Sequence, residues 1–242
     1  MREKEFRIPI PNTNLHISAK QYGDLDKPIV ILIHGLTGFM DEHLFYNGAR
    51  YFYNQGISSL RFNLYDWQQD ARKLTDCTIR THAEDLNVVI EYLKQNGAKS
   101  IHAMGHSYGG PTILLANHNQ LKSIVLWDPA YGDIFNDTDP AIYVKELNAY
   151  RIRWGTDILI GSDMRQEAKD VDWNNLTANT TVPLKIIGAG RGELGEGGKV
   201  YVGKTKGPKE LFIIENATHG FSEEGVAEEL FAESMSWVKK YE

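Results

Sequence analysis

The sequence has a single cysteine, Cys77, among 242 residues, and it has no excess of positive charge. One cysteine cannot form an intrachain disulfide, so a reducing compartment is the default expectation. Lys and Arg number 26 against 32 Asp and Glu, and the net charge of −6 is spread along the chain without a basic run. This distribution argues against nucleic acid or an anionic membrane surface as a partner.

Long apolar segments are also missing. The longest apolar runs, such as residues 29–33, have the length of a strand and fall far short of the roughly 20 residues needed to cross a bilayer. The chain opens with MREKE and continues into an alternating segment, without the apolar core and small-residue cleavage site of a signal peptide. We therefore expect a soluble, cytoplasmic protein that does not associate with membranes.

No internal repeat, low-complexity tract or linker divides the chain, and 242 residues suit one domain with a sizeable core. An amino-terminal hairpin turns at residues 11–14, and beyond it short β-branched runs alternate with segments of helical spacing. Such alternation predicts an α/β fold with a mostly parallel central sheet and helices on both faces. The expected strands are residues 29–33, 57–64, 100–104, 121–127, 184–187 and 210–214, and the expected helices are about 43–55, 81–96, 109–118 and 222–239.

The alternation stops between residues 131 and 181. This stretch is too long for a simple connection, so we interpret it as a small inserted cap on a single domain of residues 1–242. Its aromatic residues either line an acyl pocket or pack the insertion onto the domain. They include Trp154, Trp173, Tyr143 and Tyr150.

The motif GHSYG at residues 105–109 lies between an expected strand and an expected helix. The G-x-S-x-G pattern requires this setting, a sharp strand-to-helix turn that exposes the serine hydroxyl above the sheet. A side chain at position 105 or 109 would collide with neighbouring backbone, which accounts for the glycines. The alternative is a glycine-rich turn with an incidental serine, but the flanking strand and helix favour Ser107 as a nucleophile.

Two backbone amides are predicted to stabilise an oxyanion beside Ser107. The first is the amide of Tyr108, at the start of the helix that follows the motif. The second is expected from the loop after an earlier strand, where HGLTG at residues 34–38 points to the amide of Leu36. A glycine turn that merely ends the strand is the alternative interpretation of this loop.

His219 is the predicted general base. It lies in the segment ATHGF at residues 217–221, between the last expected strand and the last expected helix, which is the position and order that a base requires. The other histidines have simpler interpretations. His34 belongs to the oxyanion loop, His106 is expected to point away from the nucleophile, and His102 lies within a strand.

The acid that orients the base must follow a strand and lie between the nucleophile and the base in sequence. Glu193 fits best, because it follows the expected strand 184–187 through a glycine-rich segment. Asp128 is the alternative acid, directly after the expected strand 121–127. The sequence does not separate the two by position alone.

These residues resemble the motifs of the α/β-hydrolase superfamily, from about residue 27 to the carboxyl terminus. Within it, the chain is most similar to bacterial carboxylesterases of the feruloyl or cinnamoyl type. The similarity lies in the segments HGLTG, GISSLRFN at residues 56–63, GHSYG and ATHGF. The chain departs from the family pattern at residues 63–67, where NLYDW replaces an aspartate and a Gly-His-Gly turn, and at Glu193, where relatives usually carry aspartate.

The residues and the resemblance together imply a serine hydrolase that cleaves a small-molecule ester through an acyl-enzyme, with neither a metal nor an organic cofactor. Thioesters, amides and lactones are opened by the same catalytic parts, as are carbon–carbon bonds in related hydrolases and lyases. A catalytically silent binding protein is a further alternative, motivated by the irregular position of the acid. A homodimer is compatible with the sequence.

Overall fold

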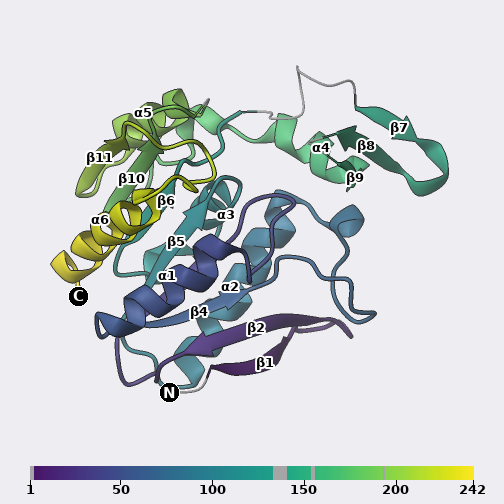
Figure 1. The fold of residues 1–242 in the computed structure, drawn as a ribbon. Coiled ribbons are helices and arrows are strands. Elements are labelled where there is room, and N and C mark those ends of the chain that lie inside the picture. The colour runs from purple at the N-terminus through teal and green to yellow at the C-terminus, as the bar shows by residue number, and fades with distance from the viewer. Residues whose placement is uncertain (1–2, 133–140, 154–155, 193) are drawn as a thin grey trace.

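The computed structural model describes residues 3–132, 141–153, 156–192 and 194–242. Its centre is a sheet in which eight described strands follow the order β1-β2-β4-β3-β5-β6-β10-β11 (Figure 1). β1 and β2 form the predicted antiparallel hairpin, β2 also pairs antiparallel with β4, and the other neighbours are parallel. The strands are β1 (Lys4–Pro9), β2 (His16–Tyr22), β3 (Ile29–Ile33), β4 (Ser58–Phe62), β5 (Ile101–His106), β6 (Ile124–Trp127), β10 (Leu184–Ala189) and β11 (Lys209–Ile214).

The sequence of β3 shows why this sheet is buried on both faces. Successive side chains of a strand point to opposite faces. In β3, Ile29, Ile31 and Ile33 join one apolar cluster, whereas Val30 and Leu32 join a second cluster on the other face. A continuous apolar run is what a strand covered from both sides requires.

Helices cover the two faces of the sheet as predicted. α2 (Ile79–Gln95), α3 (Gly109–Leu115) and α5 (Gly195–Lys204) contribute buried residues to the first cluster, and α1 (His43–Asn54) and α6 (Val226–Lys240) contribute to the second. In the described ranges, no helix has both the length and the apolar character that crossing a bilayer requires. Short 3-10 turns are η1 (Leu74–Asp76), η2 (His118–Gln120), η3 (Lys145–Leu147) and η4 (Trp173–Asn175).

The ends of the helices follow from single residues. Gly56 and Gly97 have φ of 90° and 97° and stand just beyond α1 and α2, where the sequence predicts these helices to stop. α2 begins earlier than expected, because Thr78 and Thr81 form a reciprocal capping box. α6 begins later than expected, because Gly225 has φ of 77° and cannot continue a right-handed helix.

The region between β6 and β10 contains a second sheet. β7 (Ile142–Val144), β8 (Ala149–Arg153) and β9 (Asp157–Gly161) pair antiparallel, and α4 (Ser162–Asp170) follows them. Figure 1 shows this small sheet projecting to one side of the main one. We predicted no strands here, because these strands are short and β7 presents mainly exposed residues. α5 was also missed, because four glycines in its sequence hide the helical pattern.

The aromatic residues of this region have different surroundings. Trp173 is buried, packs in the same apolar cluster as Ile79 and Met164, and donates its indole N–H to the carbonyl of Ala168 at 2.8 Å. It therefore packs the region between β6 and β10 against α2. Tyr143 is exposed, and Trp154 lies outside the described residues.

Candidate active site

Ser107 occupies a strained turn between β5 and α3, with φ of 53°. The flanking glycines have the steric cause that the sequence predicts. A Cβ on Gly105 would lie 2.5 Å from the carbonyl oxygen of Gly109, and a Cβ on Gly109 would lie 2.5 Å from the carbonyl oxygen of Ile33. Any side chain at either position would therefore force the backbone apart.

His219 and Asp128 form a hydrogen bond of 2.6 Å between Nδ1 and Oδ2. Asp128 directly follows β6, is fully buried, and accepts a second bond at Oδ1 from the amide of Ala189 at 3.2 Å. A carboxylate facing Nδ1 fixes the proton on that nitrogen and leaves Nε2 free to accept one. The carboxylate also explains Gly192, whose Cβ would lie 2.9 Å from Oδ2.

The acid favoured from sequence, Glu193, lies outside the described residues. The alternative, Asp128, is the residue that the structure brings to His219. The signal for it lies in the register of the sheet. β5 and β6 are parallel neighbours with His106 opposite Trp127, so the residues that follow them leave the sheet side by side.

His34 orients the loop that carries the predicted oxyanion donor Leu36. Its Nδ1 lies 2.8 Å from the carbonyl oxygen of Gly35, and its Nε2 accepts from the amide of Leu64 at 3.0 Å. Burial lowers the pKa of His34 to about 4, so the ring is neutral and its Nδ1–H donates. In a trans peptide the C=O and N–H point in opposite directions, so the bond to Gly35 turns the amide of Leu36 away from His34.

The amide of Leu36 has no acceptor among the described residues, and Leu36 lines a pocket with Ser107 and His219. Tyr108 is buried at the N-cap of α3. The described hydrogen bonds do not include one between the side chains of Ser107 and His219. Such bonds often tighten only when substrate binds.

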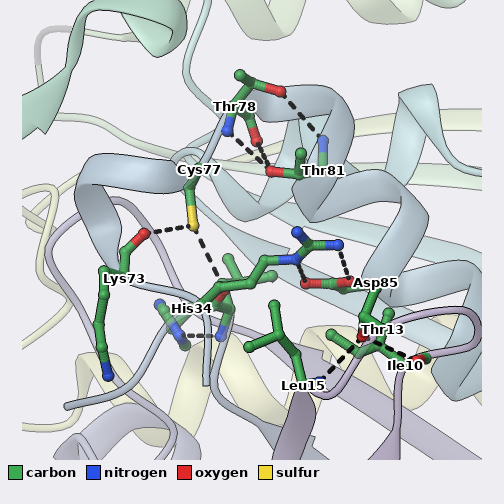
Figure 2. A network of polar contacts seen from close by, with 11 residues as sticks. Ile10, Thr13, Leu15, His34, Lys73, Cys77, Thr78, Thr81 and Asp85 are labelled. Carbon is green, nitrogen blue, oxygen red and sulfur yellow. Dashed lines mark hydrogen bonds and ion pairs between the residues drawn. The ribbon is translucent and has the colours of Figure 1, made fainter. Parts of the chain in front are cut away.

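His34 and Cys77 belong to a network of polar contacts (Figure 2). The thiol of Cys77 points to the carbonyl oxygens of Lys73 at 3.1 Å and Leu64 at 3.8 Å, and the amide of Leu64 in turn holds His34. Burial raises the pKa of Cys77 to about 12, which makes the thiol unreactive. Cys77 is thus a structural residue that supports the loop.

The pocket above Ser107 has a volume of about 580 Å³, within the range of small-molecule sites. Its lining includes two charged side chains, Glu42 and Arg191, and none of the described residues between 141 and 181. In the described part of the chain, no group of three or more His, Cys, Asp or Glu side chains is arranged as a metal site. The full lining is Gly35, Leu36, Thr37, Gly38, Glu42, His106, Ser107, Ala130, Arg191, Gly192, Leu194, Thr218 and His219.

His106 is the site residue that we interpreted wrongly from the sequence. We expected it to point elsewhere, but it lines the pocket, and its Nε2 lies 2.7 Å from the carbonyl oxygen of His219. Its position inside the G-x-S-x-G motif gave no signal of this contact, because the contact depends on where a loop more than a hundred residues later approaches.

Comparison with known proteins places this chain in a family. Residues 28–149 match the family model described as the alpha/beta hydrolase fold. None of the curated proteins matches the sequence. Among solved structures, the chain is similar to Est1E from Butyrivibrio proteoclasticus with ferulic acid bound, with 18% identity, 98% of each chain covered and a TM-score of 0.83.

Two further structures are similar over nearly the whole chain. The esterase domain of a Rhodothermus marinus protein has 16% identity, covers 100% of this chain and 99% of that one, and has a TM-score of 0.77. Dienelactone hydrolase from Anabaena variabilis has 15% identity, covers 99% and 98%, and has a TM-score of 0.70. At these identities the likeness concerns the fold, and the fold class predicted from the sequence is confirmed.

Proposed function

Because the chain belongs to the α/β-hydrolase fold family, we propose that it is a serine hydrolase that cleaves carboxylic esters through an acyl-enzyme on Ser107. The observation that carries the proposal is the 2.6 Å bond between His219 Nδ1 and Asp128 Oδ2, beside a serine on a strained strand-to-helix turn. Nucleophile and base line one pocket, as acyl transfer requires.

In the proposed acylation step, Ser107 Oγ attacks the acyl carbonyl carbon while His219 Nε2 takes the hydroxyl proton. The carbonyl oxygen becomes an oxyanion, held by the amides of Leu36 and Tyr108. The C–O bond of the ester then breaks, and His219 returns the proton to the departing alcohol. Water, deprotonated by His219, hydrolyses the acyl-enzyme and restores Ser107.

Asp128 takes the role of the acid in this proposal. It stabilises the imidazolium that forms when His219 is protonated, and it keeps the proton of the neutral ring on Nδ1. Its second oxygen is already bound to the amide of Ala189, so the carboxylate cannot rotate freely. Full burial strengthens both interactions, because water does not compete for the carboxylate.

Esters are the proposed substrates because one of the similar structures is an esterase domain and another has ferulic acid bound. A pocket of about 580 Å³ would enclose most of a small aromatic or short-chain acyl ester. The carbonyl carbon would lie above Ser107. The acyl and alcohol parts would then reach the walls that carry Glu42 and Arg191.

A fluorophosphonate tests the proposal directly, since only an activated serine should react with it quickly. We expect one adduct on Ser107, located by peptide mass spectrometry, together with hydrolysis of short-chain aryl esters. Ser107→Ala should lose both the adduct and the hydrolysis. If the unmodified protein neither reacts at Ser107 nor cleaves these esters, the proposed function is wrong.

A further inference from the structure

His106 stands next to two of the three residues assigned to catalysis. It is the last residue of β5, directly before Ser107, and it lies opposite Trp127, the residue directly before Asp128. The amide of Ser107 donates to the carbonyl of Trp127 at 3.0 Å, which ties the two turns together. A side chain at position 106 can therefore contact the base while the nucleophile and the acid keep their positions.

Two contacts join His106 to His219. Its Nε2 lies 2.7 Å from the carbonyl oxygen of His219, and the two rings lie with centroids 4.6 Å apart at an interplanar angle of 34°. A carbonyl oxygen can only accept, so Nε2 of His106 carries the proton. Phe45 and Phe221 pack against His106 with ring centroids at 6.5 Å and 6.1 Å, which restricts its rotation.

His219 needs such support because its own side chain is 41% exposed. It lies on a loop, and in the described structure its ring has one hydrogen bond, to Asp128 at Nδ1. An exposed ring on a loop has rotamer freedom that would carry Nε2 away from the nucleophile. A second fixed point on its backbone and a ring packed against it remove that freedom.

We propose that His106 is a positioning residue for the catalytic base. Through its hydrogen bond and its ring contact, His106 holds His219 so that Nδ1 of His219 faces Asp128 and Nε2 faces Ser107. The catalytic consequence rests on the proposed function. Burial and the neighbouring His219 lower the pKa of His106 to about 4. His106 is therefore neutral when His219 takes up a proton, and it adds no second positive charge beside the imidazolium.

Two substitutions separate the contacts of His106. His106→Phe keeps an aromatic ring but removes the Nε2–H donor, whereas His106→Gln places an amide N–H close to the position of Nε2 and removes the ring. His102→Gln is the matched control, because His102 lies in the same strand, is fully buried and bonds Ser100 and Ser123 instead. Melting temperature is measured for every variant alongside kcat and KM.

We expect His106→Phe to lower kcat by about 10²-fold with little change in KM, since a small misplacement of a catalytic group costs this much. His106→Gln should recover part of the loss, because it restores the donor without the ring, and His102→Gln should keep the kcat of the unmodified protein. The downfield proton NMR signal of His219 Nδ1–H should broaden or shift in His106→Phe. Unchanged kcat and an unchanged signal in that variant would overturn the proposal.

A purely structural role would show itself differently. In that case kcat and the melting temperature would fall together in both His106→Phe and His102→Gln. That result would overturn the proposal as well. The NMR comparison needs no turnover, so it tests positioning even if fluorophosphonate leaves Ser107 unmodified. Failure of the proposed function and failure of this inference therefore give different results.

Discussion

Acid should unfold this protein through its histidines. Burial lowers the pKa of His34, His102 and His106 to about 4 and that of His82 to about 3, against an ordinary value of 6.5. Unfolding exposes each ring and returns its pKa toward 6.5. Below that pH the unfolded chain binds more protons than the folded one, so the free energy of unfolding falls as the pH falls from 6.5 toward 4.

Two carboxyl groups, Asp85 and the half-buried Glu42, work in the opposite direction, because burial raises the pKa of each. Burial raises the pKa of Asp85 from 3.8 to about 6, despite its bidentate bond to Arg72, so the folded chain binds one proton more in this range. These four histidines less Asp85 leave a net uptake of about three protons on unfolding near pH 5, and the shifts of Glu42 and of His118, whose pKa burial lowers, oppose each other. The free energy of unfolding should then fall by about 4 kcal/mol per pH unit. A loss of this size is comparable with the whole stability of many domains.

Urea unfolding followed by tryptophan fluorescence, at half-unit steps from pH 7 to pH 4.5, measures this slope. His82→Leu provides the matched variant, because neither ring nitrogen of His82 has a hydrogen-bond partner among the described residues. Removing this one proton site should flatten the slope by about 1.4 kcal/mol per pH unit. In the unmodified protein, a slope below about 1.4 kcal/mol per pH unit, the value for one proton, would refute the reasoning. An unchanged slope in His82→Leu would refute it as well.

Three further predictions concern the site itself. Asp128→Asn should lower kcat by about 10³–10⁴-fold in ester hydrolysis, by analogy with other serine triads. Glu193→Gln should leave kcat unchanged. The reverse pattern would assign the role of the acid to Glu193. His34→Phe should lower kcat by up to about 10²–10³-fold with KM little changed, because the peptide between Gly35 and Leu36, which carries one oxyanion donor, loses its hydrogen bond. A change in KM alone would contradict this prediction. Gly109→Ala should destabilise the fold by about 1–3 kcal/mol in urea unfolding, because its Cβ meets backbone, whereas Gly203→Ala, in α5 with open space around it, should not.

The sequence singles out Ser107 and His219 because their signals are local. A nucleophile on this turn needs glycine two residues before and two residues after it, and the clashes at Gly105 and Gly109 show why. The β-branched run of β3 and the helical spacing of α2 are likewise patterns within single elements. Each of these features depends on residues close together in the chain.

The acid could not be chosen in this way. Asp128 and Glu193 both follow strands, and both satisfy the order of nucleophile, acid and base. What distinguishes Asp128 is that β6 is the parallel neighbour of β5, with His106 opposite Trp127. Strand order is a property of the whole sheet, so no local pattern reveals it. The contact between His106 and His219 was missed for the same reason.

The site also concentrates backbone strain. Of the six non-glycine residues with positive φ in the described chain, Thr37 at 68° and Ser107 at 53° line the pocket, and Asp128 at 39° and Phe221 at 47° contact the lining residues His219 and His106. Such conformations cost about 1–3 kcal/mol each and persist only when their surroundings impose them. Here the surroundings are strand ends, since the amides of Ser107 and Asp128 donate to carbonyls of neighbouring strands at 3.0 Å and 2.8 Å. The carboxyl ends of the inner strands β5 and β6 therefore hold Ser107 and Asp128, through these hydrogen bonds, in conformations that an isolated loop would abandon.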